Sequence, residues 1–89
     1  MQATPESLIE YPSDFPIKVM GPTHVEFAPT ILELVLGFDP SFTQDKMVAR
    51  PSGKGNYTGL TVMVRATSRA QLDALYTALS AHPMVKIVM

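Results

Sequence analysis

Apolar and polar residues alternate most clearly along residues 57–66, and a period of two is typical of a strand with one buried face. Residues 17–20 alternate in the same way, with Ile17 and Val19 on the predicted inner face and Lys18 and Met20 on the other. The inner face of the longer strand is predicted to hold Leu60, Val62, Val64 and Ala66.

Two further segments predict strands from weaker patterns. In residues 45–50 we expect Met47 and Ala49 to face inward, because the opposite register would bury two cations at a high free-energy cost. The last predicted strand is 84–89, and its inner residues are predicted to be Val85, Ile87 and Met89.

Helical spacing of apolar residues predicts a first helix between residues 23 and 38. Thr23 and Glu26 have the spacing of a capping box, in which each side chain satisfies a free N–H group of the first turn. Pro29 conflicts with a helix that starts at Thr23, because proline has no N–H to donate and clashes with the preceding turn. The helix is therefore either kinked at Pro29 or begins there, and it ends near Gly37.

A second helix is predicted after residue 68. Ser68 and Gln71 again have capping-box spacing, and His82-Pro83 ends the segment. Its buried stripe is predicted to hold Leu72, Leu75, Tyr76 and Leu79.

The order strand, helix, strand, strand, helix, strand predicts an α+β fold, the ferredoxin-like βαββαβ sandwich. Two helices would cover one face of a four-stranded antiparallel sheet, with the first and third strands in the centre. Residues 8–89 are expected to form this single domain, with 8–15 as an extended arm broken by Pro12 and Pro16. Residues 1–7 are polar and are expected to be disordered.

Composition narrows the classes of function. The net charge of −1 disfavours binding to DNA or to an anionic membrane through overall charge. With no cysteine there is no disulfide or thiolate chemistry, and the chain shows no signal peptide or span-length apolar run, so we expect a cytoplasmic protein. His24 and His82 stand apart from other ligand-type residues, so we expect no metal site, no cofactor and no catalytic centre.

Three segments stand out together, namely Phe15-Pro16 with KVMG at 18–21, RPSGKGNY at 50–57, and LYTALSAHPMVKIVM at 75–89. They resemble the YbeD-like family of small bacterial proteins of unknown function, over residues 8–89. The resemblance implies the same fold and a similarity to the ACT regulatory domain, which binds amino acids, usually at a dimer interface. Gly53 stands where the family loop has a second serine, so a role for that hydroxyl is in doubt here.

The loop after the second predicted strand contains Gly-Lys-Gly. A phosphate-binding P-loop needs Gly-Lys followed by Ser or Thr and then a helix, so this motif is excluded. The loop either only turns the chain, with glycine at positive φ, or holds an anion on converging N–H groups. The residues of this candidate anion loop are Ser52, Gly53, Lys54, Gly55 and Asn56.

The sheet face away from the helices is predicted to be basic, with no acidic residue. An acidic protein partner, an anionic ligand and a merely solvated face are the alternatives for it. RNA is disfavoured, because only Tyr57 could stack on a base. Met20, Val48 and Val88 are expected between the charges. The candidate partner-binding residues are Lys18, Lys46, Arg50, Tyr57, Met63, Arg65 and Lys86.

The turn after the first strand, Gly21-Pro22-Thr23, is the other candidate. In ACT-like domains a glycine at this turn lets a ligand approach, and a helix N-terminus favours a carboxylate, although a tight turn with a helix cap explains the same residues. The last strand is apolar on both faces apart from Lys86, so as an edge it is expected either to be covered by the N-terminal arm or to pair with a second chain in a homodimer. The sequence therefore predicts a regulatory or adaptor module with a protein partner, with a sensor of small carboxylates as the alternative.

Overall fold

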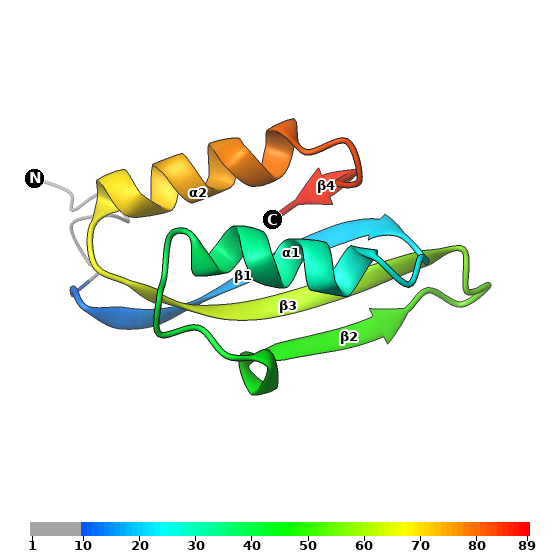
Figure 1. Ribbon diagram of the computed structural model, residues 1–89, viewed down its shortest axis with the longest axis horizontal. Helices are drawn as coiled ribbons and strands as arrows, with labels where there is room; N and C mark the ends of the chain where they lie inside the picture. The colour runs from blue at the N-terminus through cyan, green and yellow to red at the C-terminus, as the bar shows by residue number, and fades with distance from the viewer. Residues whose placement is uncertain (1–9) are drawn as a thin grey trace, which may run out of the picture.

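Residues 10–89, the part of the chain that the computed structural model describes, form a four-stranded sheet with two α-helices. The strands are β1 (Ser13–Pro22), β2 (Met47–Pro51), β3 (Tyr57–Ala66) and β4 (Ile87–Val88), and the helices are α1 (Phe27–Leu36) and α2 (Arg69–Ala81). The strands lie in the order β2-β3-β1-β4, and every neighbouring pair is antiparallel. The predicted ferredoxin-like arrangement, with β1 and β3 in the centre, is confirmed (Figure 1).

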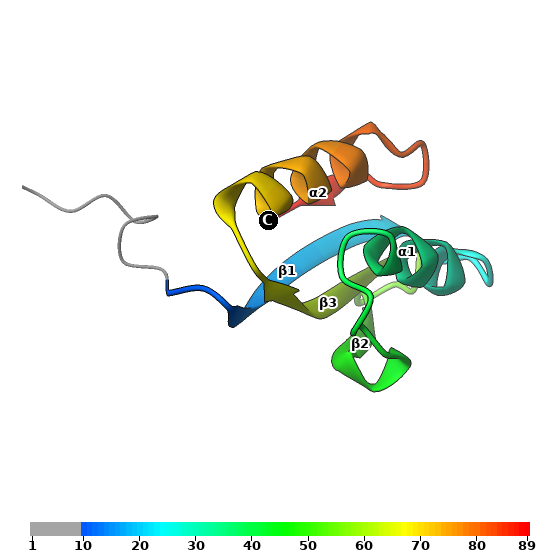
Figure 2. The same ribbon diagram turned by 60° about the vertical axis from the view of Figure 1, so that its left-hand side comes forward.

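Both helices lie on the same side of the twisted sheet, so only one face of the sheet is covered (Figures 1 and 2). The core lies between these two layers. From β1 and β3 it takes the inner residues that the alternation predicts, which are Ile17, Val19, Leu60, Val62, Val64 and Ala66. The helices contribute Phe27, Ile31, Val35, Leu72, Leu75 and Leu79.

The start of α1 settles the question raised by Pro29. The helix begins at Phe27, so Pro29 lies in the first turn, where N–H groups have no helical partner and the missing donor costs nothing. The predicted capping box of Thr23 is wrong: the residue before the helix is Glu26, and its backbone N–H donates to His24 Nδ1 at 3.0 Å. The second predicted cap is confirmed, since Ser68 Oγ accepts from the Gln71 N–H at 3.0 Å.

The extended arm predicted for residues 8–15 needs correction. Residues 1–9, including the predicted disordered segment 1–7, lie outside the described residues. Strand β1 begins at Ser13 and passes through Pro16 without a break, pairing with β3 along its whole length. Proline is tolerated there because β4 pairs only with Val19 and Met20, so β1 has a free edge at Pro16.

The two edge strands are shorter than predicted. A 3₁₀ turn, η2 (Gln44–Lys46), replaces the first part of the segment predicted as strand 45–50. The predicted inner face of the last strand is wrong in part: Val88 pairs with Val19 and packs on the core, whereas Ile87 pairs with Met20 on the open face. The regular alternation fails because Val85 belongs to a turn, in which its N–H donates to the His82 carbonyl at 3.0 Å.

Asp39 is the only buried charged residue in the described part of the chain. Its carboxylate accepts from the Ser41 N–H at 3.0 Å, the Ser41 hydroxyl at 2.6 Å and the Arg65 N–H at 2.9 Å. Burial alone would raise the pKa of Asp39, but these hydrogen bonds, with the nearby charge of Lys46, lower it below its ordinary value. Strand β2 does not extend as far as Arg65, so it offers no acceptor to the Arg65 N–H. The Asp39 carboxylate accepts from this N–H instead.

Candidate functional site

The open face of the sheet, which the helices leave uncovered, is built from rows of residues that face one another across the strands. One row runs Arg50, Gly59, Met20 and Ile87, from β2 to β4. We call it the Gly59 row. The next row contains Val48, Thr61 and Lys18. Because residues two apart on a strand share a face, these two rows form one continuous surface.

Two hollows lie on this surface and meet at Met20. The larger has a volume of about 440 Å³ and lies over the Gly59 row and the row beside it. We call it the Gly59 hollow, and its lining includes Lys18, Met20, Val48, Arg50, Gly59 and Thr61. The smaller, the Tyr57 hollow, has a volume of about 370 Å³ and is lined by Met20, Tyr57, Lys86 and Ile87. The sequence therefore placed most of the lining correctly but gave no reason to single out Gly59 or Ile87.

Three of the predicted basic residues line the hollows, namely Lys18, Arg50 and Lys86. No acidic side chain is among the described residues that line either one. Three exposed apolar side chains accompany the cations: Val48 is 57% exposed, Ile87 51% and Tyr57 44%. The surface therefore combines positive charge with apolar area that is open to a partner.

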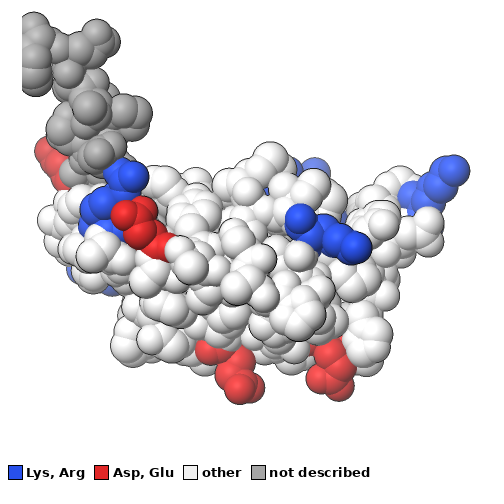
Figure 3. Space-filling model, turned by 90° about the horizontal axis from the view of Figure 1, so that it is seen from above, with Lys and Arg blue, Asp and Glu red and all other residues white. Residues whose placement is uncertain are grey.

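The remaining predicted members of the basic face do not line the hollows. Lys46 belongs to η2, and its ammonium donates to the Ser41 carbonyl at 3.4 Å. Met63 pairs with Pro16, one row beyond Lys18. Arg65 pairs with Asp14, so the prediction that this face has no acidic residue is wrong at its far end. In the view from the top of Figure 1, the acidic atoms along the lower edge lie apart from Lys and Arg, whereas acidic and basic atoms touch at the left (Figure 3).

The predicted anion loop is a hydrogen-bonded turn between β2 and β3. The Ser52 N–H donates to the Tyr57 carbonyl at 2.7 Å, and the Gly55 N–H donates to the Ser52 carbonyl at 2.9 Å. Gly55 has a φ of 75°, the conformation that favours glycine. Two of the amides predicted to hold an anion thus bond inside the turn, and Lys54 is exposed beside them. Ser52 also borders the Gly59 hollow.

The predicted ligand turn at Gly21 is filled by the chain itself. A Cβ atom at this position would lie 2.3 Å from the Met84 carbonyl oxygen and 2.6 Å from the Phe27 ring. The close approach that requires glycine here is therefore internal. Next to it, Pro22 faces Tyr57 in the strand pairing, and the Thr23 hydroxyl forms a 2.8 Å hydrogen bond with the Thr58 hydroxyl.

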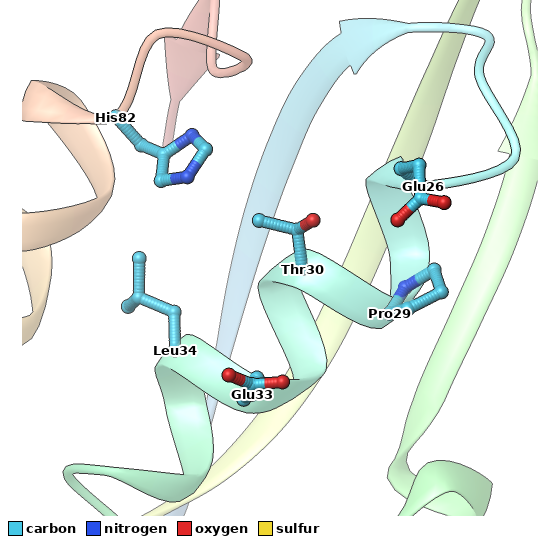
Figure 4. A pocket seen from close by; sticks show the side chains of 6 residues that line it. All are labelled: Glu26, Pro29, Thr30, Glu33, Leu34 and His82. Carbon is cyan, nitrogen blue, oxygen red and sulfur yellow. The ribbon is translucent and has the colours of Figure 1, made fainter.

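A third hollow, of about 320 Å³, lies on the helix side between α1 and the end of α2 (Figure 4). Its lining residues include Glu26, which precedes α1, Glu33 of α1, and His82. The His82 Nδ1 atom accepts a hydrogen bond from the Met84 N–H at 3.1 Å, which fixes the ring in the turn before β4. Within residues 10–89, no three His, Asp or Glu side chains are grouped as a metal site would require.

The chain belongs to a family of bacterial proteins described as "Protein of unknown function (DUF493)", whose model matches residues 6–89. The resemblance carried by the KVMG and RPSGKGNY segments is thereby confirmed. A UPF0250 protein of Ralstonia nicotianae is 68% identical over 89 residues, covering 98% of this chain and 92% of the relative. A UPF0250 protein of Bordetella parapertussis is 67% identical over 84 residues, covering 94% and 92%, and one of Paraburkholderia phytofirmans is 57% identical over the full length of both chains. In the described part of the chain, neither helix has the length and apolar character needed to cross a bilayer.

Proposed function

We propose that this protein is a non-catalytic adaptor that binds an acidic, partly apolar segment of another protein on the open face of its sheet. The observation that carries the proposal is the meeting of the two hollows at Met20, with Lys18, Arg50 and Lys86 around an apolar floor. Exposed apolar area mixed with charge of one sign is typical of surfaces that bind proteins.

The chemistry of the face favours protein over nucleic acid. Single-stranded RNA on a sheet of this topology is held by aromatic side chains in the central strands, each stacking on a base. Here the central positions are Gly59, Thr61 and Lys18, and Tyr57 lies at the end of β3. Of the exposed apolar side chains that accompany the cations, Val48 and Ile87 are aliphatic and only Tyr57 is aromatic, which suits aliphatic and aromatic side chains of a protein.

The test uses a photo-crosslinking amino acid placed at Val48, which is exposed beside the Gly59 hollow. The protein is irradiated in cells that express it, and the attached peptide is identified by mass spectrometry. We expect a peptide that contains Asp or Glu next to apolar residues. The same residue placed at Ala74, exposed on α2, controls for random contacts.

Charge reversal makes the test specific. Lys18→Glu or Arg50→Glu in the crosslinking protein should reduce the yield at least tenfold, because each places a like charge against the acidic partner. Arg69→Glu makes the same change in net charge on α2, where Arg69 pairs with Asp73 at 2.9 Å, and should leave the yield unchanged. Equal losses in all three variants, or crosslinks to nucleotides, would refute the proposal.

A further inference from the structure

Gly59 occupies an unfavourable place for a glycine. It lies inside β3, between Arg50 of β2 and Met20 of β1, in the middle of the sheet. Glycine weakens the interior of a strand because it loses more chain entropy on folding and offers no side chain to pack. A glycine at such a position calls for a specific reason, either in the backbone or in close approach of another group.

Neither the backbone nor the packing of residues 10–89 supplies that reason. Only Gly55 among the described glycines has a positive φ. A Cβ atom built on Gly59 would lie 3.8 Å from the Arg50 carbonyl oxygen and 4.0 Å from the Met20 methyl group, both ordinary contacts. The contrast with Gly21, where a Cβ would collide with the chain at 2.3 Å, is direct.

Because Gly59 has no side chain, its backbone forms the floor of the Gly59 hollow. The side chains of Met20, Val48 and Arg50 surround this floor, and the volume of about 440 Å³ is within the range of pockets that hold a compact ligand. Any side chain at Gly59 would project into the hollow, because the neighbouring residues in its row point to the same face.

We propose that Gly59 is the contact point for one large apolar side chain of the partner, which enters the hollow and packs over the backbone of β3, where Gly59 itself is buried by the side chains around it. This inference rests on the proposed function and specifies how the partner is recognised. Lys18 and Arg50 border the same hollow, so carboxylates on the partner residues two positions away from that apolar side chain would meet them. The partner segment is therefore extended, with an acidic residue, an apolar residue and an acidic residue at alternate positions.

The experiment measures binding of short synthetic peptides by NMR of the ¹⁵N-labelled protein. The probe is a peptide blocked at both ends, with the sequence Glu-Gly-Phe-Gly-Glu. Two control peptides separate the contributions: Glu-Gly-Gly-Gly-Glu lacks the apolar side chain, and Lys-Gly-Phe-Gly-Lys reverses the charges. We expect the probe to shift the amides of Met20, Gly59 and Thr61 and to bind about tenfold more tightly than either control.

Gly59→Val should fill the hollow and weaken the probe about tenfold, while binding of Glu-Gly-Gly-Gly-Glu stays the same. Gly59→Ala, which adds a single methyl group, should give an intermediate loss and serves if the valine variant does not fold. If both acidic peptides shift the open face equally and neither variant alters this, binding of acidic segments to the basic open face stands and the Gly59 contact is refuted. If no acidic peptide shifts any open-face amide, the proposed function is refuted as well.

Discussion

A matched pair of substitutions, Gly21→Ala and Gly59→Ala, should change the stability of the protein in opposite directions. Both add one methyl group to neighbouring positions of the central strand pair, since Gly59 faces Met20 and Gly21 faces Thr58. They differ in what the new methyl group meets. The comparison therefore isolates close packing from the general effect of replacing glycine in a strand.

At Gly21 the methyl group would lie 2.3 Å from a backbone oxygen of Met84 and 2.6 and 2.7 Å from two ring atoms of Phe27. Phe27 is 1% exposed, so its ring has little room to move, and the backbone at Met84 must shift instead. Adding a methyl group to a packed core costs about 1–3 kcal/mol of unfolding free energy. We expect Gly21→Ala to lose that amount.

At Gly59 the nearest atoms are 3.8 and 4.0 Å away, so the methyl group fits without displacement. Replacing glycine by alanine at a compatible backbone position stabilises a protein by about 0.4–1 kcal/mol, because the unfolded chain loses freedom. The two variants should therefore differ by roughly 1.5–4 kcal/mol.

Urea unfolding followed by circular dichroism measures both values, and an unchanged m-value would show that the unfolded states are comparable. For a domain of this size, 1 kcal/mol corresponds to a shift of about 4–8 °C in melting temperature. A loss of stability in Gly59→Ala would show that the chain itself needs this glycine. The proposed contact of Gly59 with a partner would then be refuted. An unchanged Gly21→Ala would show that the close approach of Met84 and Phe27 has been misjudged.

Two other predictions concern hydrogen bonds that fix the ends of elements. Asp39→Ala should lower the free energy of unfolding by roughly 2–4 kcal/mol near neutral pH, because it leaves the Arg65 N–H without its charged acceptor, whereas Asp45→Ala, at an exposed carboxylate, should change it little. Because the folded pKa of Asp39 is lowered, its contribution is complete above the ordinary value of 3.8 and disappears as the pH falls through the folded value, so urea midpoints of the wild type and Asp39→Ala should converge in acid. A constant difference down to pH 2 would contradict this. Ser68→Ala should cost about 1 kcal/mol through the lost bond to the Gln71 N–H, and Ser68→Asp should restore most of it, as thermal melts would show.

The central strands were predicted best, because apolar alternation and the cost of burying a charge favour the same register there. Along β3 and residues 17–20 of β1, apolar residues alternate and only one register buries no charge, so these inner faces could be assigned residue by residue, whereas the first part of β1 was missed. The edges were predicted less well. Val85 and Val88 both pack on the core, because Val85 still belongs to the turn that starts at His82, and no alternating pattern can describe such a segment.

The candidate site was likewise predicted in some parts and missed in others. The positions of Lys18 and Arg50 follow from strand parity alone, so the basic face was predictable. Lys46 was misplaced because the 3₁₀ turn changes the direction of the chain just before β2. The meaning of Gly59 could not be read from the sequence. Gly21, predicted in a turn, also lies inside a strand, and only the distances around each glycine separate the two positions.

The pairing of β1 with β3 rather than with β2 sets a limit on how early the protein can fold during its synthesis. When β1 leaves the ribosome, its partner has not been made, and it stays without one until α1, β2 and the turn at 52–56 have followed. During that interval Ile17 and Val19, which are fully buried in the finished protein, remain in contact with water or with a chaperone. Within the β1–β3 pair, Pro22 and Tyr57 are separated by the shortest loop, so this pair of strands is expected to zip from that end towards Ser13 and Ala66.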